Sequence, residues 1–225
     1  MQPDAFLFQI IILIFSVVIH EVTHGYVAQM LGDPTARLAG RLTLNPIKHI
    51  DPLGSVIIPG ILLLSGSSFL IGWAKPVPYN PYNLSNQKWG EALVAGAGPA
   101  VNIFIALIFG LIIRFGTSFD VLSGAFIEIA SFVVFINILL AIFNLIPVPP
   151  LDGSKVLASI LPYHISQKYM GIQHMLARYG ILGSFLFIFL FIYFLWKPFF
   201  TIVASIFRII TDHHLCELLS RICGF

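Results

Sequence analysis

The sequence contains few charged residues. Asp, Glu, Lys and Arg make up 10% of its 225 residues, whereas a soluble globular domain carries about 25%. Hydrophobic residues account for 58% of the chain and aromatic residues for 14%. This composition excludes an ordinary soluble domain and indicates a polytopic membrane protein.

Cysteines, repeats and excess charge are also scarce. Cys216 and Cys223 are the two cysteines, too few for a disulfide scaffold. On a helical tail they would lie roughly 10 Å apart, so we expect them to be inert and not paired with each other. The formal net charge of +2 gives no reason to expect nucleic acid. The N-terminus lacks the basic region of a cleaved signal peptide, so we expect the first helix to remain as a span.

Apolar runs predict the architecture. We expect an all-α polytopic membrane protein with a three-span core and a re-entrant segment, followed by a further C-terminal span and an amphipathic tail. The predicted spans are residues 5–30, 92–114 and 129–148, and residues 181–196 begin a last span that Lys197-Pro198 interrupts. We expect one membrane-embedded domain over 1–225, with its core at about 5–155 and the C-terminal part at about 180–225.

Residues 52–72 decide the topology, because this apolar segment is interrupted by Pro59, Gly60 and a serine-rich cluster. If it crosses the membrane, the nine cations of the loops between spans divide four to five. If it returns to the same side, they divide eight to one, with Arg114 alone on the other side. Loop cations concentrate on the cytoplasmic side. We therefore predict a re-entrant segment and an N-terminus on the outer side. The eight cations are Arg37, Arg41, Lys48, Lys75, Lys88, Lys155, Lys168 and Arg178.

The most informative motif is His20-Glu21-Val22-Thr23-His24, inside the first apolar run. Histidines at i and i+4 share one helix face, about 6 Å apart along the axis. Two such imidazoles can bind one zinc ion, and the intervening glutamate can act on a zinc-bound water. Ionisable residues are expensive within a membrane span, so their presence in this one indicates function.

Catalytic zinc usually has three protein ligands and one open position. Asp152 is the best third candidate, because it follows the end of the predicted third span. In the re-entrant topology the first and third spans run in the same direction. Their C-terminal ends, and with them His20, His24 and Asp152, then reach the cytoplasmic half of the bilayer.

The sequence resembles the site-2 protease family of intramembrane zinc metalloproteases, particularly its short prokaryotic members without a PDZ or CBS domain. The resemblance covers about residues 15–155. It rests on the stretches 20–24 (HEVTH), 98–102 (GPAVN) and 144–153 (NLIPVPPLDG), with further family-like segments at 45–52 and 72–78.

The resemblance implies a three-span catalytic core with one zinc per chain, held by His20, His24 and Asp152, and Glu21 as the general base. It also implies a multi-pass protein of a prokaryotic cell membrane with its active site toward the cytoplasm. The substrate would be a transmembrane-helix or signal-peptide-like protein, and a homo-oligomer stays open. Two amides are candidates for substrate binding: Asn102, from its depth in the second span, and Asn144.

Other classes remain open at this stage. A membrane metal transporter or metal sensor would explain intramembrane histidines, but it gives Glu21 no role, and the internal repeats of many transporters are not found. A metalloprotease of another architecture would use a helical glutamate as third ligand, with Glu91, Glu128 and Glu217 as candidates. A structural membrane subunit would require a degenerate site, whereas every expected site residue is present.

Overall fold

The structure is a computed structural model, which describes residues 3–65, 72–119, 121–178, 183 and 190–219. These residues form helices joined by loops, and no strand occurs among them. The all-α prediction is confirmed. The elements in chain order are α1 (Pro3–Met30), α2 (Thr35–Leu38), η1 (Pro46–His49), η2 (Pro52–Ile57), α3 (Ile58–Leu64), η3 (Pro81–Asn83), α4 (Gly90–Ser118), α5 (Gly124–Asn144), α6 (Asp152–Ile160), α7 (Tyr163–Arg178), η4 (Phe191–Leu195), α9 (Trp196–Thr211) and α10 (Leu215–Leu218).

Among the described residues, four helical stretches are long and apolar enough to cross a membrane. They are Leu7–Met30, Gly90–Ser118, Gly124–Asn144 and Tyr193–Thr211. The three predicted core spans are therefore present, each with shifted ends, and a further C-terminal span follows them. This composition and length agree with an integral membrane protein.

The predicted interruption at Lys197-Pro198 does not end the last span. The apolar helical stretch continues through both residues to Thr211. Pro198 lies in the first turn of α9, where its missing N–H removes no α-helical hydrogen bond. Residues 181–182 and 184–189, also part of the predicted span, lie outside the described residues.

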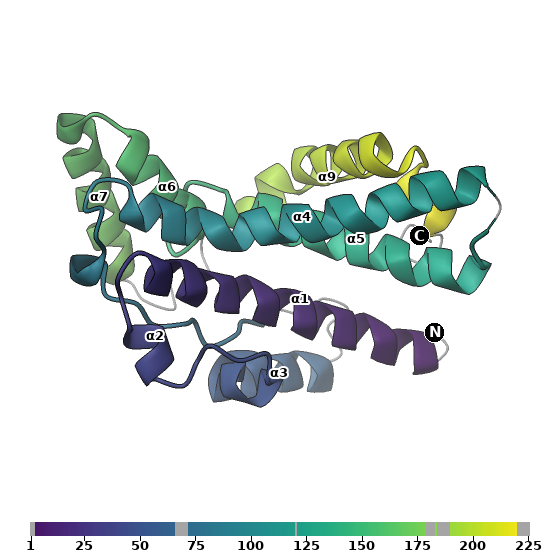
Figure 1. The fold of residues 1–225 in the computed structure, drawn as a ribbon, viewed down its shortest axis with the longest axis horizontal. Coiled ribbons are helices and arrows are strands. Elements are labelled where there is room, and N and C mark those ends of the chain that lie inside the picture. Colours follow the sequence, from purple (N-terminus) through teal and green to yellow (C-terminus); the bar gives the residue numbers. More distant parts are fainter. Residues whose placement is uncertain (1–2, 66–71, 120, 179–182, 184–189, 220–225) are drawn as a thin grey trace.

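The long helices lie side by side (Figure 1). α4 runs opposite to α1 and α5, so the first and third helices run in the same direction, as the sequence predicted. α9 packs on α4 and α5 through a buried apolar cluster that includes Ile113, Val134 and Phe207. α6 follows α5 at the end of the molecule where α1 ends. The C-terminal ends of α1 and α5 thereby bring the motif helix and Asp152 together.

Between α1 and α4, residues 73–75 return to pair with residues 49–54. The N–H of Trp73 donates to the carbonyl of Gly54 at 3.2 Å, and the N–H of Lys75 donates to that of His49 at 2.9 Å. Residues 72–80 then follow without helical or strand structure, and we call them the covering segment. Residues 66–71, part of the predicted re-entrant stretch, lie outside the described residues. Re-entry into a membrane stays a prediction.

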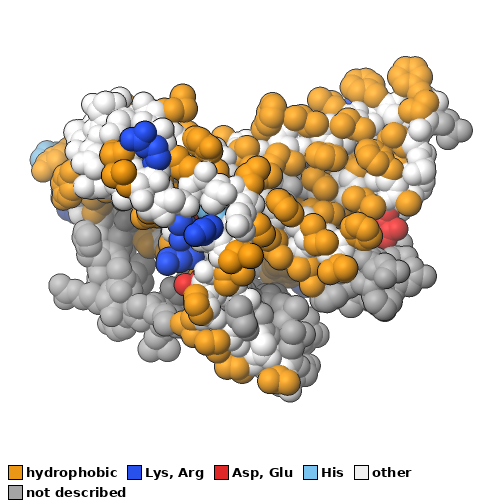
Figure 2. Space-filling model, turned by 60° about the horizontal axis from the view of Figure 1, so that its bottom comes forward, with side chains coloured by type: hydrophobic (Ala, Val, Ile, Leu, Met, Phe, Trp, Pro, Cys, Tyr) orange, Lys and Arg blue, Asp and Glu red, His pale blue; other side chains and the backbone are white. Residues whose placement is uncertain are grey.

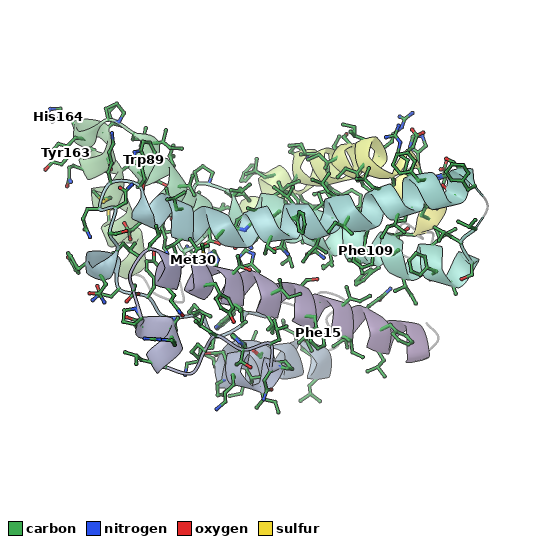
Figure 3. All side chains as sticks on the ribbon, in the orientation of Figure 1. Phe15, Met30, Trp89, Phe109, Tyr163 and His164 are labelled. Carbon is green, nitrogen blue, oxygen red and sulfur yellow. The ribbon has the colours of Figure 1, made fainter. Side chains whose placement is uncertain are left out.

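Apolar side chains cover the surface over the long helices, and most of the visible Lys and Arg side chains gather toward one end (Figure 2). Phe15 on α1 is among the exposed apolar residues. Trp89 and Tyr163, both exposed, lie together at one end of the molecule (Figure 3). Aromatic residues of this kind are typical of a membrane–water interface. The surface pattern therefore suits a bilayer.

The expectation of unpaired cysteines is wrong, because Cys216 is disulfide-bonded. The expectation depended on a continuous helical tail. The last described helix, α10, ends at Leu218, so the helical spacing does not extend to Cys223, which lies outside the described residues.

Candidate metal centre and active site

His20, His24 and Asp152 come together in space although 128 residues or more separate the aspartate from the histidines in sequence. The two histidines lie one helical turn apart on α1, and Asp152 is the first residue of α6. The Nε2 atoms of His20 and His24 each lie 3.2 Å from Oδ2 of Asp152. One ligand atom from each residue lies within 4.8 Å of the others. The predicted group of three is present.

The other ring nitrogen of each histidine fixes which atom faces this centre. Nδ1 of His20 lies 2.6 Å from Oδ1 of Asn102, and Nδ1 of His24 lies 2.6 Å from the carbonyl oxygen of Val94. Both partners are acceptors, so each Nδ1 carries the hydrogen and donates. In the neutral rings, both Nε2 lone pairs therefore point toward the carboxylate of Asp152.

Three lone-pair atoms that converge without an intervening hydrogen repel one another, and a bound cation removes that repulsion. Ligands about 2.1 Å from a tetrahedral zinc ion are separated by roughly 3.4 Å, close to the 3.2 Å between each Nε2 and the carboxylate oxygen. Two neutral imidazoles and one carboxylate are also a ligand set of catalytic zinc sites. The residues present fit a zinc ion.

Asp152 begins α6, and its Oδ2 faces the Nε2 atoms of both histidines. Gly153 explains how α6 begins so close to α5. A Cβ atom there would collide with the backbone carbonyl of Leu145. The Asp152-Gly153 pair therefore combines a ligand with the close approach that positions it.

Glu21 faces the same cavity, which has a volume of about 140 Å³. Its Oε2 accepts a hydrogen bond from the N–H of Val77 at 2.9 Å. Pro76, Val77 and Tyr79 of the covering segment also line the cavity. The sequence motif predicted Glu21 at the site, but nothing in the sequence predicted its hydrogen bond to Val77.

Two polar residues hold the covering segment in place. Nη2 of Arg41 donates to the carbonyl of Lys75 at 2.6 Å, and Oδ2 of Asp33 accepts from the N–H of Asn80 at 2.7 Å. Asp33 is buried and also accepts hydrogen bonds from Thr35 and Asn83. Burial raises the pKa of Asp33, but these hydrogen bonds lower it by more, so the carboxyl group stays ionised.

The two predicted substrate-binding amides differ in position. Asn144 lines the cavity, and its Nδ2 donates to the carbonyl of Leu140 on the same helix. Asn102 is fully buried. Its Oδ1 contacts His20 and its Nδ2 donates to Asn137 at 2.7 Å. These contacts argue against direct substrate binding by Asn102, because both of its polar atoms already have protein partners.

Lys155, predicted from the sequence only as a loop cation, is a residue of the cavity wall. It follows Asp152 by one turn of α6 and lines the cavity. Its Nζ lies 5.0 Å from the centre of the Tyr79 ring. Burial lowers the pKa of this ammonium group, but Tyr79 and nearby carboxylates raise it by more, so Lys155 is charged. Its spacing of three residues from Asp152 was the sequence feature that could have placed Lys155 on the same helix face and so at the cavity.

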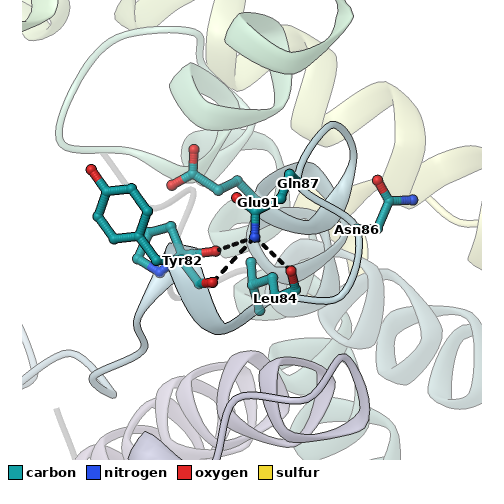
Figure 4. Close-up of a pocket in the computed structure, with 6 residues that line it drawn as sticks. Tyr82, Leu84, Asn86, Gln87 and Glu91 are labelled. Carbon is teal, nitrogen blue, oxygen red and sulfur yellow. Dashed lines mark hydrogen bonds between the residues drawn. The ribbon is translucent and has the colours of Figure 1, made fainter.

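A second cavity, about 260 Å³ in volume, lies near the start of α4 (Figure 4). Gln87 organises its wall, because its Nε2 donates to the carbonyls of Pro81, Tyr82 and Leu84. Glu91 lines this cavity. Within the described residues, neither Glu91 nor the other glutamates considered as third ligand joins the His20–His24–Asp152 group.

The two imidazoles of α1 and the carboxylate of Asp152 converge beside Glu21, and α1 is one of the helices that could cross a membrane. Together they define a membrane-embedded metalloprotease. Comparisons with known proteins agree. Peptidase family M50 matches residues 119–190, which include Asp152. The chain is 38% identical over 164 residues to "Putative zinc metalloprotease YwhC" of Bacillus subtilis, which covers 71% of each protein.

More distant relatives carry similar names. "Putative zinc metalloprotease Rip2" of Mycolicibacterium smegmatis is 31% identical over 62% of this chain and 52% of that protein. "Zinc metalloprotease MJ0392" of Methanocaldococcus jannaschii is 30% identical over 71% of this chain and 34% of that protein. No solved structure matches the chain. The chain belongs to peptidase family M50, the site-2 protease family. The predictions of a zinc metalloendopeptidase and of a zinc cofactor are confirmed.

Proposed function

We propose that this chain is an intramembrane protease that hydrolyses peptide bonds within or near transmembrane segments of membrane proteins. The observation that carries the proposal is the convergence of three ligand atoms beside Glu21, where two of them and Glu21 lie on a helix apolar enough to span a bilayer. Two-thirds or more of YwhC is covered by the match, which supports a shared activity class.

His20, His24 and Asp152 are the zinc ligands in this proposal, with one zinc per chain. Bound zinc supplies Lewis acidity, which polarises a peptide carbonyl and makes a water molecule more acidic. Glu21 is the general base: its carboxylate takes a proton from water in the cavity and delivers it to the leaving nitrogen. The Val77 N–H holds that carboxylate at the cavity wall, which limits the orientations it can take.

The covering segment and Asn144 would contact the substrate. A transmembrane helix must unwind before its backbone can be cut, and an extended chain can pair with another extended segment. Residues 72–80 form no helix, and Pro76, Val77 and Tyr79 among them line the cavity, so this segment is available to pair with an unwound substrate. Asn144 lines the same cavity and is proposed to hydrogen-bond the substrate backbone. Lys155 adds a cation that can attract a carbonyl oxygen as it gains negative charge.

The proposed orientation follows from charge. Loop cations gather at the end of the molecule where α1 ends and α6 begins, and such loops favour the cytoplasmic side. The whole chain would form one membrane-embedded domain in a prokaryotic cell membrane, with residues 52–72 re-entering from the cytoplasmic face. Its substrates would be transmembrane-helix or signal-peptide-like proteins.

Glu21→Gln in the purified full chain tests the function. The amide keeps the shape of the side chain but cannot take up the proton, so we expect zinc content to persist while cleavage of a transmembrane-helix substrate falls about 10²–10⁴-fold. Glu217→Gln is the matched control, because Glu217 caps α10 and is not among the cavity-lining residues. Normal cleavage by Glu21→Gln would reject the protease mechanism, and undiminished metal flux across vesicles would favour a transporter.

A further inference from the structure

We propose that Asn102, Asn137 and Ser16 are positioning residues, which together orient the His20 ring toward zinc through a chain of hydrogen bonds. The inference rests on the proposed function, because it takes His20 as a zinc ligand. It replaces the substrate-binding role predicted for Asn102 and gives a role to two residues that no sequence motif indicated.

The chain of hydrogen bonds joins three helices. Ser16 and His20 lie on α1, Asn102 on α4 and Asn137 on α5. Nδ2 of Asn137 donates to Oγ of Ser16 at 3.0 Å, and Nδ2 of Asn102 donates to Oδ1 of Asn137 at 2.7 Å. Oδ1 of Asn102 then accepts from Nδ1 of His20 at 2.6 Å. Asn102 and Asn137 are both 0% exposed.

One backbone carbonyl sets the donor-to-acceptor direction of this series of hydrogen bonds. Nδ2 of Asn137 also donates to the carbonyl of Val133 at 2.9 Å. A carbonyl only accepts, so the amide nitrogen of Asn137 must face Val133 and its Oδ1 must face Asn102. The nitrogen of Asn102 therefore faces Asn137, and its oxygen faces His20. The hydrogen of the His20 ring is thereby placed on Nδ1, which leaves the Nε2 lone pair for the metal.

The two histidines reach the same tautomer by different means. His24 donates directly to the backbone carbonyl of Val94, whereas His20 donates to a side chain. An asparagine side chain can turn over and exchange its donor and acceptor, and a backbone carbonyl cannot. Asn137 prevents that exchange at Asn102. The Oδ1 of Asn102 is therefore held toward His20, as a backbone carbonyl oxygen would be.

Simple adhesion between helices does not explain this pattern. One hydrogen bond between Asn102 and Asn137 would join α4 to α5 without any contact to His20. The observed chain instead ends on a metal ligand, and partners of this kind commonly fix the tautomer and orientation of zinc-binding histidines. Metal affinity should therefore depend on residues that do not touch the metal.

The test measures zinc affinity of the purified full chain by competition with a chelator, together with the absorption spectrum of the cobalt-substituted protein. Asn102→Leu removes the acceptor and should weaken zinc binding about 10–100-fold and shift the cobalt spectrum. Asn102→Asp keeps an acceptor for His20 and should bind zinc more tightly than Asn102→Leu. Asn137→Leu should weaken binding less than Asn102→Leu does.

The decisive readout is non-additivity. Because Asn137 acts through Asn102, the double variant should bind zinc no more weakly than Asn102→Leu alone. By the same reasoning, adding Ser16→Ala to Asn137→Leu should not weaken zinc binding further. This pair tests the series of hydrogen bonds even if Asn102→Leu does not fold. Ser131→Ala is the matched control: Ser131 is fully buried on α5 and its Oγ has no hydrogen-bond partner among the described residues, so zinc affinity should not change.

If both Asn102→Leu and Asn137→Leu bind zinc as tightly as the wild type, or if their losses of affinity simply add, the proposal is wrong. These side chains would then only hold the helices together. Absence of zinc binding by the wild-type chain would instead overturn the proposed function. The two failures are therefore distinguishable.

Discussion

Gly98→Ala adds a single methyl group at the point where α4 passes His20 and His24, the two proposed zinc-ligand histidines. A Cβ atom at Gly98 would lie 2.5 Å from Nε2 of His24 and 2.6 Å from Nε2 and Cε1 of His20. Favourable carbon contacts lie at about 3.5–4.0 Å, so the methyl group requires movement of roughly 1 Å. Either α4 moves away from α1 or the two imidazoles move.

The magnitude follows from the cost of overpacking. An extra methyl group in a packed interior costs about 1–3 kcal/mol, and the better helix propensity of alanine returns up to about 1 kcal/mol. Rings displaced by about 1 Å no longer match the ligand positions, and misplacement of that size can cost about 10²-fold in rate. We expect zinc affinity to fall about tenfold or more, and cleavage about 10²-fold.

Gly96→Ala provides the control, because a Cβ atom there meets nothing within 4 Å and the helix is the same. It should keep wild-type zinc content and cleavage. The assay compares zinc content, chelator competition and cleavage of a transmembrane-helix substrate for the two variants. If Gly98→Ala binds zinc and cleaves as well as Gly96→Ala, then α4 and the imidazoles are not in the close contact described, and the geometry of the site is wrong.

Three further predictions test other parts of the structure. Asp152→Ala removes one proposed ligand, so bound zinc measured by elemental analysis should fall together with cleavage; unchanged zinc would remove Asp152 from the ligand set. Cysteines introduced at Asn45 and Ser85 should react with an impermeant thiol reagent from the same, cytoplasmic side, with the wild-type chain as background, and labelling from opposite sides would reject re-entry. Asp33→Asn should lower thermal stability at pH 7. Since the pKa of Asp33 is lowered by folding, its contribution is present at neutral pH and is lost as the pH falls below about 4, so the difference in melting temperature should shrink there; a constant difference would contradict this role.

The sequence predicted the parts of the site that depend on spacing along a helix and on the direction of the spans. His20 and His24 had to share a helix face, and parallel first and third spans had to place Asp152 at the same end. The positions of Asn102 and Lys155 could not be predicted in this way. Depth in a span does not say which helix a side chain faces, and a lysine after Asp152 reads equally well as a loop cation.

The covering segment was harder still, because its place depends on contacts between distant residues. Nothing near Val77 in the sequence indicates that its N–H meets Glu21, since the bond depends on Arg41 and Asp33 holding the segment. The continuation of the last span past Pro198 has a local reason. Proline is compatible with the first turn of a helix, and the sequence alone did not show that α9 begins at Trp196.

The charge of Lys155 affects which ions the cavity favours. The formal charges of Glu21, Asp152 and Lys155, which all line the cavity, sum to −1. A divalent cation changes the total to +1. With the proposed zinc ion bound, the formal charge of +1 would disfavour a second cation in the cavity, because like charges repel. The same charge would favour anionic ligands over cationic ones.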